Sequence, residues 1–196
     1  LSSSRAQAQR LIAAGVQWRL DEGAPWRRVA KNGDDVPPGA QIELLDLAES
    51  RYVSRGGLKL EGALKATGVN VRGLVCLDVG QSTGGFTDCL LQHGAAHVVG
   101  VDAGWGQVHA NLRGDARVTC VERVNARELD ASHLIAENDD PTLDTAEKHS
   151  EFDFLTGDLS FISLTLVLPA LMPLLKPDGT LLMLVKPQFE LQPGQV

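Results

Sequence analysis

Short apolar runs alternate with longer amphipathic stretches over residues 55–196. The runs are flanked by Gly, Asp and Asn, as expected for strands that are buried on both faces of a parallel sheet. Strands are predicted over residues 74–79, 97–102, 117–121, 152–158 and 180–186. Helices are predicted over residues 57–67, 86–93, 107–112 and 164–175, with a polar loop over 138–150. This alternation indicates an α/β fold with a doubly wound, mostly parallel sheet.

The first part of the chain has a different pattern. A helix is predicted to follow Ser4 as its N-cap and to end at Gly15, and three short strands over residues 16–20, 26–30 and 41–45 come after it. Turns rich in Asp, Asn, Pro and Gly separate these strands. The pattern predicts a small α+β module over residues 1–48, a linker over 49–54 and the α/β domain over 55–196.

Composition narrows the class of protein. Hydrophobic residues make up 43% and charged residues 22% of the chain, which excludes a disordered tail and a collagen-like repeat. No apolar run approaches the roughly 20 residues of a membrane-spanning helix. Cys76, Cys89 and Cys120 have neither metal-ligand spacing nor the pattern of a disulfide framework, so no metal site is predicted. We expect these cysteines to be small buried hydrophobes in a reducing cytoplasm.

Charge is distributed unevenly along the chain. The net charge is −7, but residues 1–48 are neutral, residues 49–72 carry five basic and two acidic side chains, and residues 73–196 are strongly acidic. A local basic surface can bind phosphate groups even in an acidic protein. The acidic total therefore does not exclude a nucleic-acid partner.

The strongest chemical signal is the segment 78–87, where a strand ends in an acid and a glycine-rich turn leads into a helix. Its spacing matches neither the dinucleotide fingerprint nor the phosphate-binding P-loop. An acidic strand end is better suited to a zwitterionic or cationic ligand than to a pyrophosphate. The alternative is a tight turn without a ligand. The candidate ligand-binding residues of this segment are Asp78, Gly80, Ser82, Thr83, Gly84, Gly85 and Phe86.

Three further residues follow the next strands. Asp102 ends the second strand, where a carboxylate can accept hydrogen bonds from both hydroxyls of a ribose, although it could instead cap the next helix. Asn125 follows the third strand, where it could hold an adenine edge or simply form a turn. Trp105 could pack on an adenine, lie in the core or start a helix. Together these features resemble a class I, Rossmann-like methyltransferase that uses S-adenosyl-L-methionine.

Candidate catalytic residues stand at the ends of the last two predicted strands. Asp158 ends the fourth strand and Lys186 the fifth, and ligand sites in open α/β sheets lie at these ends. Lys59 lies on the helix before the first strand, where a solvent-exposed lysine needs no special explanation. Two lysines beside one aspartate could bind, orient and deprotonate a hydroxyl group.

Four segments in order resemble the FtsJ-like ribose 2′-O-methyltransferases, and more closely the TlyA group, also called hemolysin A. They are residues 51–60 (RYVSRGGLKL), 76–87 (CLDVGQSTGGFT), 158–163 (DLSFIS) and 185–190 (VKPQFE). The resemblance implies a Lys-Asp-Lys-Glu tetrad, of which Lys59, Asp158 and Lys186 match the first three members. It also implies that an S-four type RNA-binding module, named for a ribosomal protein, precedes the methyltransferase domain, and residues 4–15 are similar to its second helix.

Both parts are expected to be incomplete in this sequence. The S-four type module normally opens with another helix, which would precede Leu1, and the final Glu of the tetrad would follow Val196. Glu190 follows Lys186 closely and is not assigned to that position.

The resemblance implies methyl transfer to a ribose 2′-hydroxyl of ribosomal RNA, with cytidine as the expected target and ribosomal RNA or subunits as partners. Lys186 would act as the base or orienting group and Asp158 would orient it. One alternative is a methyltransferase for a protein or small molecule, against which the two lysines that could activate a hydroxyl argue. The others are a non-catalytic RNA- or ribosome-binding protein with a vestigial cofactor pocket, and a hemolysin-type membrane-active protein. No spanning segment or basic amphipathic helix supports the last alternative. The candidate phosphate contacts are Arg5, Arg10, Arg27, Arg28, Lys31, Arg51 and Arg55.

Overall fold

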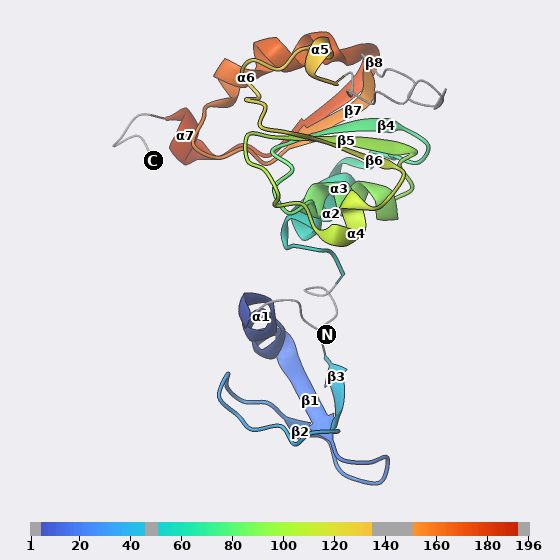
Figure 1. Cartoon of the computed structure of the whole chain (residues 1–196), viewed down its shortest axis with the longest axis vertical. Helices are drawn as coiled ribbons and strands as arrows, with labels where there is room; N and C mark the ends of the chain where they lie inside the picture. The colour runs from blue at the N-terminus through green and yellow to red at the C-terminus, as the bar shows by residue number, and fades with distance from the viewer. Residues whose placement is uncertain (1–4, 46–50, 135–150, 192–196) are drawn as a thin grey trace. The chain divides into compact units, whose positions relative to one another are not determined.

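The computed structural model describes residues 5–45, 51–134 and 151–191 of the 196-residue chain. The chain divides into two compact units, Leu1–Arg55 and Gly56–Val196, and each is considered by itself (Figure 1). The division lies one residue beyond the segment 49–54 that was expected to be the linker. Ser4 and the predicted polar loop over 138–150 lie outside the described residues.

The first unit contains one helix and a three-stranded antiparallel sheet in the order β2-β1-β3. Its core is small, with Leu11 of the helix packed together with Val16 and Val29. The predicted helix and three strands are confirmed, although the second strand is shorter than the pattern indicated. The elements are α1 (Arg5–Gly15), β1 (Val16–Arg19), β2 (Arg27–Arg28) and β3 (Gln41–Leu44).

The second unit is built on a five-stranded sheet in the order β6-β5-β4-β7-β8. Every neighbouring pair of strands is parallel, which confirms the predicted doubly wound sheet. Its strands are β4 (Val75–Val79), β5 (His97–Asp102), β6 (Val118–Glu122), β7 (Phe152–Gly157) and β8 (Leu175–Met183). Its helices are α2 (Gly56–Thr67), α3 (Gly85–Gln92), α4 (Ala110–Arg113), α5 (Ala131–Leu134), α6 (Leu164–Leu171), the 3-10 helix η2 (Met172–Leu174) and α7 (Pro187–Glu190).

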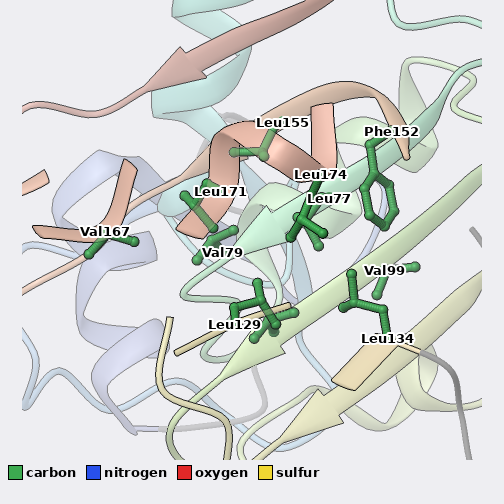
Figure 2. Packing of buried hydrophobic residues seen from close by; sticks show 11 residues of the cluster. Leu77, Val79, Val99, Leu129, Leu134, Phe152, Leu155, Val167, Leu171 and Leu174 are labelled. Carbon is green, nitrogen blue, oxygen red and sulfur yellow. The ribbon is translucent and has the colours of Figure 1, made fainter. Parts of the chain in front are cut away.

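Helices cover both faces of this sheet: α2, α3 and α4 lie on one face and α5 and α6 on the other (Figure 1). The central strands β4, β5 and β7 are therefore buried on both faces, whereas the edge strands β6 and β8 are only partly buried. On the face of α5 and α6, strand side chains such as Leu77 and Val99 pack with Val167 and Leu171 of α6 (Figure 2). The residues of this cluster are buried, and their packing stabilises the strands after which the candidate site residues follow.

The order of the strands reverses at β4. The chain runs from β4 outward to β5 and β6 on one side, then returns to place β7 and β8 on the other side. At such a point the loops that follow two adjacent strands diverge and leave a crevice, which is where ligands bind in open α/β sheets. Here those loops follow β4 and β7, and they carry Gly80 and Asp158.

Several predicted boundaries were wrong near the end of the chain. The helix predicted over 164–175 ends at Leu171, and β8 begins at Leu175 rather than at residue 180. β8 also ends at Met183, so Lys186 is not its last residue. The reason is the length of the neighbouring strand: Met183 pairs with Gly157, the last residue of β7, and beyond it no partner strand continues. Lys186 instead precedes the first residue of α7.

Shorter elements were also misjudged. α4 covers Ala110–Arg113 rather than 107–112, because His109 caps it by accepting a hydrogen bond from the backbone N–H of Asn111 at 3.3 Å. The single-turn helices α5 and α7 were not predicted. Within the part of the chain that the structure describes, no helix has the length and apolar character to span a bilayer.

Candidate active site

One carboxylate holds two lysines at the carboxyl end of the sheet. Asp158 follows β7 directly, and its Oδ2 lies 2.6 Å from Lys59 Nζ while its Oδ1 lies 2.6 Å from Lys186 Nζ. Lys59 reaches this point from α2, and Lys186 from the loop after β8. Lys186 Nζ also donates a hydrogen bond to Ser160 Oγ at 2.6 Å. The structure thus brings together the three residues that the sequence proposed as catalytic, from segments far apart in the chain.

The two lysines differ in exposure. The side chain of Lys186 is 19% exposed, whereas that of Lys59 is 49% exposed. Partial burial opposes ionisation of Asp158, but hydrogen bonds and positive charge from Lys186 and Lys59 outweigh it and hold the pKa of Asp158 below its ordinary value. Asp158 is therefore a carboxylate at neutral pH, and the group of three carries a net positive charge when both amines are protonated.

The loops after β7 and β8 meet at further points. The centroids of the Phe161 and Phe189 rings lie 5.4 Å apart. Phe161 remains 91% exposed despite this contact. Glu190 accepts a hydrogen bond from the Ser163 hydroxyl at 2.6 Å and another from the backbone N–H of Leu164 at 2.8 Å. The loop that carries Lys186 is thus joined to the loop that carries Asp158 along most of its length.

The glycine-rich turn after β4 requires glycine at two positions. Gly80 has φ +84° and Gly84 has φ +95°, both in the left-handed region. A Cβ on Gly84 would lie 2.3 Å from Leu112 Cδ1, and one on Gly80 would lie 3.0 Å from Leu159 Cδ2. The turn therefore packs closely against α4 on one side and against the loop after β7 on the other, and Gly84 directly precedes α3.

Asp78 lies beneath this turn and is only 1% exposed. Its Oδ2 accepts a hydrogen bond from Thr87 Oγ1 at 2.7 Å, while its Oδ1 has no hydrogen-bond partner among the residues that the structure describes. Burial raises the pKa of Asp78 to about 7, the hydrogen bonds from Thr87 lower it, and the charges of Asp102 and Asp158 add to the rise. An unpartnered buried carboxylate oxygen is costly unless a donor or a proton satisfies it.

Asp102 connects two loops. It ends β5, and its Oδ2 accepts the backbone N–H of Ser82 at 2.8 Å while its Oδ1 accepts the backbone N–H of Gly104 at 2.7 Å. Each carboxylate oxygen has a second lone pair that remains able to accept another donor. Asp102 thus lies beside the glycine-rich turn, as expected for a residue that holds ribose hydroxyls.

Trp105 is neither a core residue nor the start of a helix, which removes two of the three interpretations of its sequence position. Its side chain is 67% exposed, and the guanidinium of Arg123 lies 5.1 Å from its ring. Asn125 is exposed, and its side-chain oxygen accepts the backbone N–H of Arg127 at 3.1 Å. This hydrogen bond agrees with the interpretation of Asn125 as a turn residue. It uses only the side-chain oxygen, and the NH₂ group of Asn125 does not take part in it.

Backbone strain is concentrated at the same edge of the sheet. The non-glycine residues with positive φ among those described are Ser82 (+50°), Arg123 (+63°) and Phe161 (+65°), which follow β4, β6 and β7. Strained residues persist where the surrounding structure determines them, and they are common in ligand sites. Their placement supports a functional site along this edge.

Several site residues were not singled out from the sequence. Gln81 is buried, donates a hydrogen bond to Thr87 Oγ1 at 3.0 Å and lies against Gly100, where a Cβ would come within 2.0 Å of its side chain. Thr87 and Ser160 were also missed as site residues, although both stand within the quoted segments. The available signal was that each lies in the same short segment as a candidate carboxylate, Asp78 or Asp158.

Arginines of the first unit lie beside aromatic rings, and Arg27 and Arg51, which are candidate phosphate contacts, are exposed. Arg27 Cζ lies 5.5 Å from the Trp18 ring, and Arg19, which was not proposed, lies 4.5 Å from the Trp26 ring. Arg51 Cζ lies 6.0 Å from the Tyr52 ring. Arg10 is placed on α1. The other candidates, all exposed, are Arg5, Arg28, Lys31 and Arg55.

Comparison with known proteins identifies similar chains. The family described as FtsJ-like methyltransferase matches residues 52–196. The chain is 43% identical over 196 residues to a Mycobacterium tuberculosis protein named 16S/23S rRNA (cytidine-2′-O)-methyltransferase TlyA, which covers all of this chain and 66% of that protein. It is 35% identical over 196 residues to hemolysin A of Brachyspira hyodysenteriae, again over all of this chain and 73% of that protein.

A solved structure has a similar fold. A Streptococcus thermophilus protein described as a hemolysin is 39% identical and superposes with a TM-score of 0.68, covering 100% of this chain and 65% of that one. The chain thus spans about two thirds of the length of these relatives (66% and 65%).

Proposed function

Because the chain belongs to the FtsJ-like methyltransferase family and, within it, to the group of TlyA and hemolysin A, we propose that it transfers a methyl group from S-adenosylmethionine to a ribose 2′-hydroxyl of ribosomal RNA. One observation carries this proposal: Lys59 and Lys186 converge on Asp158, each at 2.6 Å. Two amines held by one carboxylate at the carboxyl ends of strands suit the activation of a hydroxyl group.

The residues around the glycine-rich turn fit S-adenosylmethionine. Asp102 has free lone pairs for ribose hydroxyls, and Asp78 has an unpartnered buried oxygen close to the turn. Gly80 and Gly84 keep the backbone turn compact where the cofactor would approach. Trp105 is exposed and could cover the adenine, with Asn125 near its edge. The cofactor, when bound, supplies a methyl group that is already activated by the positive charge on sulfur.

The chain's own residues then act on the acceptor. A ribose hydroxyl is a weak nucleophile until its proton is removed or shared. Lys186, fixed by Asp158 and Ser160, accepts that proton when its amine is neutral, and Lys59 stabilises the negative charge that develops on the oxygen. Asp158 holds both amines at a fixed spacing. Positioning of the hydroxyl supplies much of the rate enhancement.

The first unit serves as the RNA-binding module of S-four type in this proposal. Its exposed arginines would contact phosphates, and the Arg–Trp pairs offer both charge and a stacking surface. The name of the M. tuberculosis relative makes a cytidine in ribosomal RNA the first substrate to test. Such a substrate would place the activity in the cytoplasm.

The experiment combines binding and transfer. We expect calorimetric titration to show S-adenosylmethionine binding that is lost in Asp102→Ala, and we expect the wild-type chain to transfer a labelled methyl group to ribosomal RNA. Protection of the methylated nucleotide from alkaline hydrolysis identifies the 2′-oxygen as the acceptor. Cofactor binding without transfer to any ribosomal RNA would contradict the proposed substrate, and absence of binding would contradict the proposed chemistry.

A further inference from the structure

We propose that Glu190 is a positioning residue for Lys186: its carboxylate clamps the loop after β8 to the start of α6 and thereby holds Lys186 Nζ at Asp158 and Ser160. The contacts are short, with Glu190 Oε2 2.6 Å from Ser163 Oγ and Oε1 2.8 Å from Leu164 N. The catalytic consequence rests on the function proposed above, whereas the clamp itself does not.

The clamp acts on Lys186 through a single helical turn. Lys186 immediately precedes α7, and Glu190 is the last residue of α7. Pro187 occupies the first position of that turn, where its fixed φ favours the helix, and the backbone N–H of Phe189 donates to the Lys186 carbonyl at 2.9 Å. Because this hydrogen-bonded turn joins the two residues directly, holding Glu190 in place also restrains the backbone from which the Lys186 side chain extends.

The other side of the clamp is tied to Asp158. Ser163 is the N-cap of α6 and ends the loop 158–163, and its hydroxyl also accepts the backbone N–H of Thr165 at 3.2 Å. The two loops are therefore joined at both ends, by Lys186 with Asp158 and by Glu190 with Ser163 and Leu164. The Phe161–Phe189 ring contact lies between these points along the chain. Loss of the Glu190 contacts removes the hydrogen bonds at one end of this pair of loops and leaves the Lys186 loop held by the Phe161–Phe189 contact and by the contacts of Lys186 itself.

Glu190 does not hold an amine as Asp158 does. Its two carboxylate oxygens accept hydrogen bonds from a backbone amide and a hydroxyl, groups that do not need a negative charge opposite them. A glutamine has the same shape, and its amide can accept from Leu164 N–H and donate to Ser163 Oγ. Glu190→Gln therefore keeps the clamp without the charge, and Glu190→Ala removes both.

The first test measures the position of Lys186 without requiring activity. The wild-type chain, Glu190→Gln and Glu190→Ala are acetylated briefly with limiting acetic anhydride, and the rate at each lysine is read by peptide mass spectrometry. We expect Glu190→Ala to raise the rate at Lys186 several-fold and to leave Lys176, which pairs with Asp153 at 2.6 Å, unchanged. Glu190→Gln should resemble the wild type. An unchanged rate at Lys186 in Glu190→Ala would overturn the proposal, and an equal rise at both lysines would show general loosening instead.

The second test uses methyl transfer to ribosomal RNA by the same chains. Glu190→Ala should lower kcat by about 100-fold, since misplacement of a reacting group on the order of 1 Å costs that much. Its affinity for S-adenosylmethionine should not change, and Glu190→Gln should restore most of kcat. Glu128→Ala, which removes an exposed carboxylate, is the control. Equal loss of kcat in Glu190→Gln and Glu190→Ala would assign Glu190 a direct catalytic role and refute positioning, whereas an inactive wild-type chain would count against the proposed function alone.

Discussion

Asp158 is the residue on which the candidate site depends, because Lys59 and Lys186 both form an ion pair with its carboxylate. Asp158→Asn keeps the size of the side chain but removes the charge that holds the two amines. We expect it to lower methyl transfer by about 100-fold or more while cofactor affinity stays the same, since transfer needs the aligned amines and cofactor binding does not. Incorporation of labelled methyl groups and calorimetry measure the two effects.

A matched control is available within the same unit. Asp115 pairs with Arg117 at 2.6 Å, a comparable distance, away from the crevice. Asp115→Asn should leave methyl transfer close to that of the wild type. A similar loss of transfer in both variants would show that ion pairs of this unit act only through stability.

The raised pKa of Asp78 should make the free energy of unfolding of the protein fall as the pH rises. Burial raises the pKa of Asp78 from 3.8 to about 7, so between these values the native state binds a proton that the unfolded state has released. The contribution of this group to the free energy of unfolding is thus complete below about pH 4 and is lost as the pH rises to about 7. Asp78→Asn cannot ionise, so we expect the variant to gain stability relative to the wild type as the pH rises through this window.

Urea unfolding of both chains at about pH 5 and about pH 8 tests this expectation. The comparison between the two chains matters because carboxylates with lowered pKa, such as Asp158 and Glu122, act in the opposite direction in both of them. A difference in stability that is independent of pH would contradict the raised pKa of Asp78.

At the scale of elements, the turn between β4 and α3 forms part of the proposed cofactor site. Gly84→Ala places a Cβ at a positive φ and within 2.3 Å of Leu112 Cδ1, so we expect it to destabilise the fold by about 1–3 kcal/mol and to weaken cofactor binding. Gly114→Ala is the control, because Gly114 has φ −91° and its nearest neighbour would lie at 3.6 Å. Thermal unfolding and calorimetry report the two effects, and a Gly84→Ala variant with unchanged cofactor affinity would remove this turn from the site.

The sequence predicted those elements whose identity depends on local pattern. The five strands of the large sheet and the turn 78–87 follow from apolar runs and glycines, which act over a few neighbouring residues. The end of β8 did not follow, because it is set by where the neighbouring β7 stops. α7 and the contacts of Glu190 depend on α6, a partner that pattern alone does not identify. Lys59 was a candidate as the second lysine that could accompany Asp158, and the family resemblance matched it to the tetrad, but its spacing from Asp158 in the sequence contains no information about contact.

At the scale of the whole molecule, the proposed function assigns RNA affinity to the exposed arginines of the first unit and the chemistry to the second unit. Arg28 is exposed on β2, opposite Gln17 of β1. We expect Arg28→Ala to weaken RNA binding and to leave cofactor affinity unchanged. The slope of log K for RNA binding against the logarithm of the salt concentration should become shallower by about one. Arg117→Ala, in the second unit, is the control. Filter binding over a range of KCl concentrations measures the slope, and an unchanged slope for Arg28→Ala would show that this side chain makes no phosphate contact.

The reversal of strand order at β4 also bears on biosynthesis. The residues proposed to bind the cofactor lie on β4, β5 and the turns that follow them, which are contiguous in the chain, whereas Asp158 and Lys186 follow β7 and β8. During translation β4 and β5 leave the ribosome first, and Asp158 and Lys186 can meet only after β7 has paired with β4 and β8 with β7. If the chain acts as proposed, a nascent chain is thus able to assemble its cofactor site before it is competent to modify any RNA, including that of the ribosome producing it.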